Sequence, residues 1–248
     1  MNVVLVTQAR FGSTRFKGKI LEKINDKTIL QIHLENLRRS KFANQFIVAT
    51  TNELESDIIC DIAKSNHFKF YKGDLNNVLS RYYNSLKEFS PDYVVRVTSD
   101  CPLIDSILID EIIYYTIFNK LSYCCTSEYF PDGVDVEVFK FDELKIAFLN
   151  AKLDSEKEHV TPYIKNSLKN TNFISEYKSN YDFNNVRFTL DEECDLEAIK
   201  ILIKEFGINA RWYEYEGFII NNNHLFQNQS IKRNEGYLKS LVKDKKNE

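Results

Sequence analysis

The segment from Gln8 to Lys19 is the richest in residue types that bind phosphate. It reads Q-A-R-F-G-S-T-R-F-K-G-K and holds two glycines, two hydroxyl side chains, two arginines and two lysines. Small residues let backbone N–H groups approach an anion, and cationic side chains neutralise its charge. The spacing matches neither a Walker A motif nor a G-x-G-x-x-G fingerprint, which argues against a P-loop NTPase and a dinucleotide-binding enzyme. The segment therefore predicts a polyphosphate site, with a solvated basic loop as the alternative.

Two aspartates stand directly after apolar, strand-like runs, where they can meet that loop. Asp100 follows the run at 93–98, and Asp191 follows the run at 186–190. Carboxylates in such positions hold Mg²⁺ against the phosphates of a nucleotide. The alternative is that each aspartate only caps a helix or a turn. On the first reading, two carboxylates from distant segments share one metal ion.

Three acidic residues in the second half are candidates for binding a second substrate. The stretch V-D-V-E-V-F at 134–139 alternates acidic and apolar residues, which predicts a strand with one polar face. We expect Asp132, Asp135 and Glu137 to form an acidic patch on that face, because residues two apart share a face. The patch would bind sugar hydroxyls or a second Mg²⁺, or else form a polar edge facing solvent.

A histidine and a basic motif are further candidates. His159 lies in E-H-V-T at the start of a predicted helix, and it would orient or deprotonate an acceptor hydroxyl. Its alternative is a structural histidine that is hydrogen-bonded to a glutamate or to backbone. The K-R-N motif at 232–234 would meet an acceptor carboxylate or phosphate, or simply begin a basic helix.

The elements that must position these residues alternate over the first hundred residues. The predicted strands are 2–7, 45–50, 68–71 and 93–98, and the predicted helices between them are 29–39, 53–66 and 78–89. This alternation predicts an α/β fold with a mostly parallel, doubly wound sheet. Ligands of such sheets bind beyond the carboxyl ends of the strands, so the segments 8–19, 73–77 and 99–105 should converge.

The second half is less regular. The predicted helices are 108–118, 142–151, 158–166 and 196–206, and the predicted strands are 134–139 and 186–190. Beyond about residue 217 the chain is polar and rich in asparagine, which suggests a peripheral arm. Without repeats or flexible linkers, we expect one domain over 1–241, with a small β-rich insertion at about 120–180 and a basic tail at 242–248.

Composition excludes several classes of protein. The chain has 248 residues, with 33 Lys and Arg against 36 Asp and Glu, and a net charge of −3 argues against nucleic-acid binding. No run of about 18 apolar residues is present, so the sequence predicts no transmembrane helix. The first apolar run, at 3–6, is too short for a signal peptide. The five cysteines lack metal-binding spacing, which favours a reduced, cytoplasmic protein.

Eight sequence blocks, in order, match a known family. They are A-R-F-G-S-T-R-F-K-G-K, F-I-V-A-T-T, G-D-L-N-N-V-L-S-R-Y-Y, V-R-V-T-S-D-C-P-L-I-D, P-D-G-V-D-V-E-V-F, E-H-V-T-P-Y-I, R-F-T-L-D-E-E-C-D-L-E and I-K-R-N-E-G-Y-L-K-S-L. The chain resembles the spore-coat-polysaccharide-type cytidylyltransferases and, more distantly, the CMP-3-deoxyoctulosonate and CMP-sialate synthetases. The resemblance covers nearly all of residues 3–241 and implies a Rossmann-like nucleotidyltransferase fold.

The resemblance implies a role for each matching residue. The first loop would cradle the triphosphate of CTP through Arg10, Gly12, Ser13, Arg15 and Lys19. Backbone groups of Ala9 would lie beside the cytosine, and Asn77 and Arg81 would lie near the base, the ribose or the acceptor. Asp100 would bind Mg²⁺ with Asp191 as the second carboxylate, and catalysis would rest on Arg10, Lys19, Asp100 and the metal.

The implied reaction is transfer of a cytidylyl group from CTP to a small acidic sugar or phosphorylated metabolite, with release of pyrophosphate, for a surface glycan such as capsule, lipopolysaccharide or flagellin glycan. The relatives commonly dimerise through the inserted part, so a homodimer is expected. Two alternatives stay open. A phosphomonoester acceptor would give a CDP-linked product, and a non-catalytic relative would only bind the nucleotide. A retaining glycosyltransferase is disfavoured by the Arg- and Lys-rich first loop.

Two residues depart from the family pattern. Lys17 stands where proline is usual, which predicts a less rigid and more cationic loop. Asn77 stands where aspartate is common, which removes a charge near the base or acceptor site. The second departure leaves the identity of the acceptor open.

Overall fold

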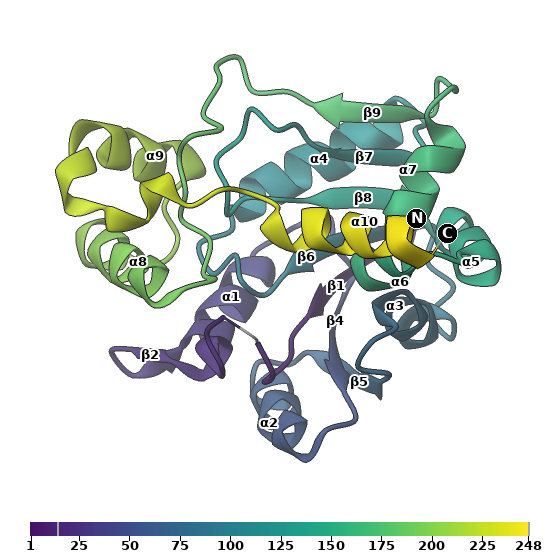
Figure 1. Ribbon diagram of the computed structural model, residues 1–248, viewed down its shortest axis with the longest axis horizontal. Coiled ribbons are helices and arrows are strands. Elements are labelled where there is room, and N and C mark those ends of the chain that lie inside the picture. Colours follow the sequence, from purple (N-terminus) through teal and green to yellow (C-terminus); the bar gives the residue numbers. More distant parts are fainter. Residues whose placement is uncertain (14, 248) are drawn as a thin grey trace.

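A seven-stranded sheet forms the centre of the computed structural model, which describes residues 1–13 and 15–247 (Figure 1). Its strand order is β5-β4-β1-β6-β8-β7-β9. The pairs β5–β4, β4–β1, β1–β6 and β7–β9 are parallel, whereas β8 runs antiparallel to both β6 and β7. The predicted α/β fold with a mostly parallel sheet is confirmed.

The first half supplies the parallel strands and their crossover helices. Its strands are β1 (Val3–Gln8), β4 (Gln45–Thr51), β5 (Lys69–Gly73) and β6 (Tyr93–Thr98). Its helices are α1 (Ile29–Leu37), α2 (Asp57–Ser65) and α3 (Val78–Leu86), with a small hairpin of β2 (Lys23–Ile24) and β3 (Lys27–Thr28) before α1. Short 3₁₀ turns at Lys19–Leu21 and Leu54–Ser56 precede β2 and α2.

The second half extends the same sheet and covers it. Its strands are β7 (Tyr123–Thr126), β8 (Glu137–Lys140) and β9 (Ile174–Tyr177). Its helices are α4 (Ser106–Phe118), α5 (Phe141–Asn150), α6 (Asp154–His159), α7 (Pro162–Leu168), α8 (Glu193–Phe206), α9 (Trp212–Asn221) and α10 (Glu235–Asn247), with 3₁₀ turns at Asn223–Leu225 and Gln227–Ser230.

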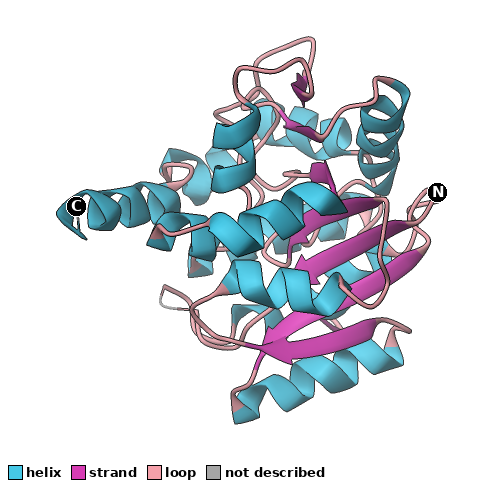
Figure 2. Cartoon of the chain, turned by 90° about the vertical axis from the view of Figure 1, so that its right-hand side faces the viewer, coloured by secondary structure: helices cyan, strands magenta, loops and turns pink. Residues whose placement is uncertain are grey.

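Apolar side chains cover both faces of the central strands. Successive residues of β1 belong to different clusters, because side chains of a strand alternate between faces. One cluster packs α1, α2, α4 and α8 against the sheet, and the other packs α3, α5 and α7 against its opposite face. Figure 2 shows the strands side by side with helices lying along them. This layering leaves the carboxyl ends of β1 and β6 at one edge, where the site lies.

Two predicted strands are shorter than expected or absent. The run at 134–139 is a strand only from Glu137 onward, as β8. The run at 186–190 is extended and makes a single isolated bridge, between Arg187 and Asp132. Gly133 explains this close approach, since its φ is 125° and an added Cβ would lie 2.8 Å from the Thr189 nitrogen. Ionic contacts of Arg187, described below, take the place of a ladder.

Helix boundaries also differ from the predictions. The helix expected at 158–166 is divided, because α6 ends at His159 and α7 begins at Pro162, with Val160 between them at a φ of 71°. Pro162 has no N–H with which to continue the hydrogen bonds of α6, and it is accommodated in the first turn of α7, where none is needed. Residues 53–66 divide similarly into a 3₁₀ turn and α2.

The segments expected as an insertion and a tail are parts of the main body. The strands within 120–180 join the main sheet, accompanied by three helices. Residues 242–247 continue α10 and do not form a separate tail. Among the described residues, none of the helices has both the length and the apolar character that crossing a bilayer demands.

Candidate active site

The loop after β1 reverses direction and places Lys19 at the carboxyl edge of the sheet. Ala9 is buried and donates its N–H to Ala49 O at 3.2 Å, which continues the β1–β4 pairing. Gly18 donates to Phe11 O at 3.0 Å and has a φ of 74°, a conformation that favours glycine. An added Cβ there would also lie 3.2 Å from the Phe11 ring. The return of the chain at Gly18 thus sets the start of the 3₁₀ turn that carries Lys19.

Lys19 joins three segments that are far apart in the sequence. Its Nζ donates to Leu190 O at 2.6 Å and to Asp191 Oδ1 at 2.8 Å, and it lies 3.5 Å from Asp100 Oδ2. Arg15 forms a second ion pair with Asp191 Oδ1 at 2.9 Å. The structure therefore brings together Arg15, Lys19, Asp100 and Asp191, as the sequence predicted for a shared site. Thr14, inside the same loop, lies outside the described residues.

Backbone contacts hold the two aspartates beside each other. The carbonyl of Asp100 accepts the N–H of Leu190 at 2.7 Å and the Thr189 hydroxyl at 2.9 Å. These bonds tie the end of β6 to the extended segment at 186–190, so the next residue, Asp191, faces Asp100 across Lys19. The side chain of Asp100 is about one-third exposed, which leaves its oxygens accessible from the cleft.

A buried histidine, which the sequence analysis did not single out, connects the loop that carries Asp100 to β1. His33 Nδ1 lies 2.9 Å from Cys101 O, and its Nε2 lies 2.9 Å from Thr7 Oγ1. Burial lowers the pKa of His33 to about 4, so the ring is neutral at pH 7. Because a carbonyl only accepts, Nδ1 carries the proton and Nε2 accepts from Thr7. His33 thereby fastens the Asp100 loop to β1.

Arg187 is the centre of a buried ionic network behind Asp191. Its guanidinium forms a bidentate pair with Asp195, at 2.9 Å from Nε and 2.8 Å from Nη2. The same group contacts Asp132 Oδ2 at 2.6 Å and Asp191 Oδ2 at 3.4 Å. Asp195 also accepts the N–H of Asp191 at 2.8 Å. The pair Arg187–Asp195 therefore fixes the backbone and the side-chain direction of Asp191.

The expected acidic patch does not form one face. Asp132 is held by Arg187, Asp135 forms an ion pair with Arg233, and Glu137 is 8% exposed in a separate cluster. Burial and the neighbouring Asp135 raise the pKa of Asp132 to about 7, against the opposing effect of Arg187 and Arg233. The prediction of an acidic patch on one strand face was wrong, because only Glu137 lies in a strand and basic side chains from distant segments pair with all three acids.

Glu137 is the acceptor of a buried polar cluster at the floor of the cleft. Arg96 and Lys165 form ion pairs with it, the latter at 3.1 Å, and the hydroxyls of Tyr123 and Thr161 donate to it at 2.5 and 2.7 Å. Burial alone would raise the pKa of Glu137, but the two cations and the two hydroxyls outweigh burial and hold this pKa well below its ordinary value. Glu137 is thus an ionised carboxylate whose hydrogen-bonding capacity is used within the fold.

Asn77 and Arg81 line the cleft but are committed to local structure. Asn77 Oδ1 accepts the N–H of Ser80 at 2.9 Å and so caps α3. Arg81 is buried and donates to the carbonyls of Asp74 and Leu75, while its Nε has no partner among the described residues. These contacts hold the loop 73–77 at the carboxyl end of β5.

His159 ends α6 and faces the C-terminal helix. Its Nε2 lies 2.9 Å from Ser240 Oγ, and that hydroxyl donates onward to Tyr237 O at 2.8 Å. The Ser240 hydroxyl therefore accepts from the ring, and the ring also packs edge-on against Tyr237 at 5.0 Å. Burial lowers the pKa of His159, so a neutral imidazole links α6 to α10. Its geometry fits the structural alternative better than a general base.

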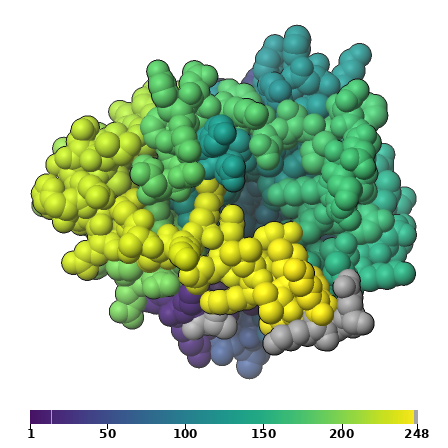
Figure 3. Space-filling model, turned by 45° about the horizontal axis from the view of Figure 1, so that its top comes forward, coloured from purple at the N-terminus to yellow at the C-terminus, as the bar shows by residue number. Residues whose placement is uncertain are grey.

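The loop after β1, Asp100, Asp191 and the Glu137 cluster border one cleft of about 1200 Å³. The cleft extends from the loop after β1, past Asp100 and Asp191, to α6, α7 and α10. Figure 3 shows the recess between the yellow C-terminal segment and the green residues of the α6–α7 region. Every residue of the predicted site except Gly12 lines this cleft. The sequence analysis missed the contributions of Arg96, Lys157, Lys165 and most of α10, since their motifs carry no recognisable spacing.

Comparison with known proteins assigns the family. A family model described as cytidylyltransferase matches residues 3–232. The solved structure of a cytidylyltransferase from Leptospira borgpetersenii superposes with a TM-score of 0.87 at 33% identity, over 94% of this chain and 100% of that one. The chain belongs to the cytidylyltransferase family. It is therefore a nucleotidyltransferase, as the resemblance implied.

Two curated relatives of this cytidylyltransferase carry functional names. The spore coat polysaccharide biosynthesis protein SpsF of Bacillus subtilis is 28% identical over 215 residues, which cover 83% of this chain and 88% of that protein. The 3-deoxy-manno-octulosonate cytidylyltransferase of Bdellovibrio bacteriovorus is 34% identical over 114 residues, which cover 45% and 44% of the two chains. The similarity to both relatives agrees with the family resemblance seen in the sequence blocks.

The carboxylates of Asp100 and Asp191 are arranged as one mode of Mg²⁺ binding requires. Within residues 1–13 and 15–247, no three His, Cys, Asp or Glu side chains are arranged to hold a metal by themselves. Asp100 and Asp191, however, converge on one point, which Lys19 Nζ occupies. Mg²⁺ is usually bound by one or two carboxylates together with phosphate oxygens. The pair suits that mode of binding.

Replacing Glu137 with glutamine is expected to lower the free energy of unfolding at pH 7 by about 3 kcal/mol, because Arg96 and Lys165 lose a buried partner. The folded-state pKa of Glu137 lies below its unfolded value of 4.5, so the stabilisation is full above that pH and is lost as the pH falls. Urea unfolding at pH 7, 5, 4 and 3 should show the difference between variant and wild type shrinking below pH 5. The exposed Glu205→Gln is the control, and a pH-independent difference would contradict the assignment.

Proposed function

We propose that this cytidylyltransferase transfers CMP from CTP to a hydroxyl of a small acidic sugar, with Mg²⁺, in the synthesis of a surface glycan. The acceptor oxygen forms a bond to the α-phosphorus, the bond to the bridging oxygen of the β-phosphate breaks, and pyrophosphate leaves. The acceptor proton passes to solvent or to a nearby base. The observation that carries this proposal is the meeting of Lys19, Asp100 and Asp191 at the carboxyl edge of the sheet.

The side chains around Lys19 provide the positioning and charge neutralisation that this reaction needs. Arg10 is exposed in the cleft, and Arg15 and Lys19 stand beside it in the same loop. These cations would hold the triphosphate and stabilise the charge that builds up on the departing pyrophosphate. Mg²⁺, held by Asp100 and Asp191 with phosphate oxygens, would supply Lewis-acid stabilisation of the same charge.

Backbone and side-chain acceptors near β1 support selection of cytosine. The N–H of Ala9 is used by Ala49, so its carbonyl is the backbone group left for a base. Gln8 Oε1 also faces the cleft region, buried and without a partner among the described residues. Both oxygens would accept from the 4-amino group of cytosine, whereas the 4-oxo group of uracil would repel them.

The nucleotide preference tests this proposal. We expect turnover with CTP to exceed turnover with UTP by roughly 100-fold in kcat/KM, and ATP and GTP to be inactive. The measurement is pyrophosphate release with each nucleotide and a panel of sugar acids, with the product mass recorded. A single phosphate in the product indicates a CMP-sugar, and two indicate a CDP-linked compound from a phosphomonoester. If the protein neither binds CTP nor turns it over, the proposal is refuted.

Support for the glycan role comes from the two relatives, one named for spore coat polysaccharide biosynthesis and one for a sugar acid. A homodimer, expected from the resemblance, remains part of the proposal. Within residues 120–180, the aromatic side chains of Tyr123 and Phe130 are buried in the fold at 1% and 2% exposure. Tyr129, at 40% exposure, is accessible to a partner.

A further inference from the structure

The C-terminal helix α10 lies over the cleft without contributing to the hydrophobic core. Neither apolar cluster contains a residue beyond Phe226. Leu238 and Val242 of α10 are 57% and 55% exposed, and the residues that α10 buries are the polar Ser240 and Asp244. A helix normally gains its stability in a protein by packing an apolar face. Core packing therefore does not explain the presence of α10 at this place.

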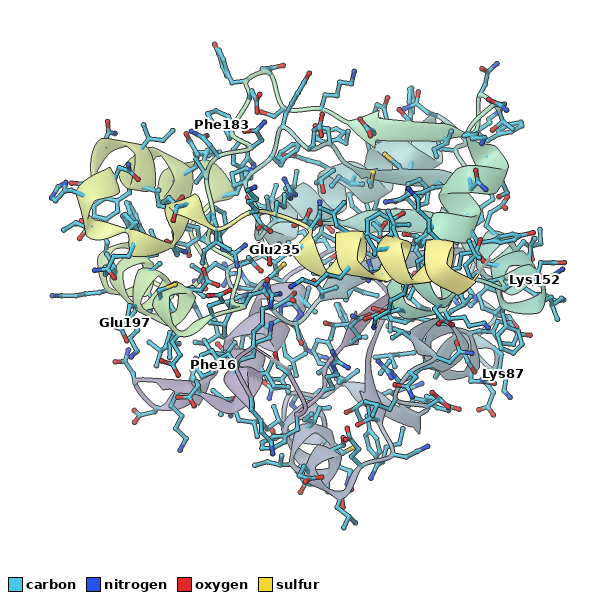
Figure 4. All side chains as sticks on the ribbon, viewed as in Figure 1. Phe16, Lys87, Lys152, Phe183, Glu197 and Glu235 are labelled. Atoms are coloured by element: carbon cyan, nitrogen blue, oxygen red, sulfur yellow. The ribbon has the colours of Figure 1, made fainter. Side chains whose placement is uncertain are left out.

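Polar contacts and the packing of Tyr237 against the His159 ring hold α10 on the cleft. Ser240 accepts from His159, and Asp244 Oδ1 accepts the N–H of Ser155 at 3.3 Å. At its start, Arg233 donates to Phe130 O at 2.9 Å and forms its ion pair with Asp135. In Figure 4, Glu235 at the start of α10 lies near the centre of the view, whereas Lys152 lies at its edge. The helix is thus fastened at both ends and by its middle, over the opening of the site.

The face that α10 turns toward the cleft is basic. Gly236, Lys239 and Lys243 line the cleft and repeat at helical spacing on one face. Lys157 of α6, against which α10 packs, lines the same stretch. Lys239 contacts Glu235 at 3.5 Å, while neither Lys157 nor Lys243 forms an ion pair within the described residues. Glu235 thus offsets part of the charge of Lys239, whereas Lys157 and Lys243 present ammonium groups to the cleft without an ion-pair partner in the part of the chain that the structure describes.

We propose that α10 is the acceptor-binding element of the enzyme, and that Lys239, Lys243 and Lys157 bind an anionic group of the acceptor, a carboxylate or a phosphate. The inference rests on the proposed function and adds the residues that choose the acceptor. The expected acceptor ligands Asp132, Asp135 and Glu137 are neutralised within the fold, so they do not offer a competing site.

The same wall can also accept hydrogen bonds from sugar hydroxyls. Asp154 and Glu158 of α6 line the cleft beside the lysines and are exposed. A wall that carries both lysines and carboxylates matches a polyhydroxylated acid better than a neutral sugar. Because α10 contributes no residue to either apolar cluster, it can shift on its contacts as the acceptor enters.

Steady-state kinetics test the assignment. The wild type and the double variant Lys239→Ala with Lys243→Ala are compared using CTP and four probes: 3-deoxy-manno-octulosonate, N-acetylneuraminate, glycerol 3-phosphate and glucose. We expect the double variant to raise the KM of the charged acceptor at least about tenfold, while the KM of CTP stays unchanged. The preferred probe distinguishes a carboxylate from a phosphate as the recognised anion.

Lys245→Ala is the matched control, since Lys245 lies on the same helix, is exposed and does not line the cleft. The control should leave both KM values unchanged. Wild-type turnover with an unaltered acceptor KM in the double variant, or a preference for glucose, would overturn the inference and leave cytidylyl transfer intact. Absence of turnover with every probe, together with no CTP binding by calorimetry, would overturn the proposed function and this inference with it.

Discussion

Replacing Asp100 with asparagine is expected to lower kcat by roughly 10³-fold while leaving the fold intact. The change removes the negative charge that would hold Mg²⁺ against the triphosphate, but keeps the size of the side chain. The backbone carbonyl of Asp100, which binds Leu190 and Thr189, is unaffected. The side chain of Asp100 is about one-third exposed, and its ion pair with Lys19 is long, at 3.5 Å. Little folding stability therefore depends on this side chain.

Pyrophosphate release over a range of Mg²⁺ concentrations is the measurement for Asp100→Asn, with thermal unfolding followed in parallel. The control is Asp61→Asn, because Asp61 is exposed on α2 and lies outside the cleft. We expect the control to match the wild type in both assays. An Asp100→Asn enzyme with wild-type turnover and wild-type Mg²⁺ dependence would remove Asp100 from the site.

Replacing Lys19 with methionine is expected to lower kcat by about 10²- to 10³-fold. Methionine keeps much of the aliphatic stem but removes the ammonium group that contacts Leu190 O, Asp191 and Asp100. Loss of this charge would weaken the grip on the triphosphate and would leave two carboxylates facing each other. We therefore also expect the variant to bind Mg²⁺ more tightly than the wild type when no nucleotide is present.

Calorimetric titration with Mg²⁺ separates a role in the site from a general structural role. A variant that was merely less stable would lose activity without gaining affinity for the metal. Lys23→Met serves as the control, because Lys23 lies in the β2–β3 hairpin and is exposed outside the cleft. Unchanged Mg²⁺ affinity combined with unchanged kcat in Lys19→Met would show that Lys19 is not part of the nucleotide site.

The network around Arg187 holds Asp191 in place when Lys19 is removed. Asp191 is held from one side by Lys19 and Arg15, and from the other by Arg187 and the Asp195 carboxylate that binds its N–H. Burial would raise the pKa of Asp191, but the surrounding cations lower it, so Asp191 remains ionised. Removal of Lys19 changes the charge at the cleft, whereas the direction of the Asp191 side chain stays fixed by Arg187.

The nucleotide half of the site could be read from the sequence because its residues are local to strand ends. Val3–Gln8 and Tyr93–Thr98 are mostly buried, β-branched strands, and both were predicted within one residue. The meeting of Arg15 and Lys19 with Asp100 follows from their places in the loop after β1 and at the end of β6, since parallel neighbours end at one edge of a sheet. The pairing of Asp191 with Asp100 was predicted for the same reason, although its strand proved to be an isolated bridge.

The acceptor half could not be read in this way, because its contacts join residues far apart in the chain. The alternation at 134–139 predicts an exposed acidic face, but the ionic partners of those acids are Arg96, Arg187 and Arg233. No local sequence pattern predicts which basic side chain will form an ion pair with which acidic one. The C-terminal residues looked like a polar arm because few of them are apolar. The structure instead folds these polar residues into α10 and places that helix over the cleft.

The sequence by itself thus determined the fold class, the family resemblance and the cationic loop after the first strand, since these depend on periodicity and on residues adjacent in the chain. The tertiary structure alone decided that Glu137 is an internal counterion, that His159 supports a helix, and that Lys239 and Lys243 face the cleft. The physical reason is that the free energy of a buried charge depends on its partners in space, and those partners are set by how distant segments pack.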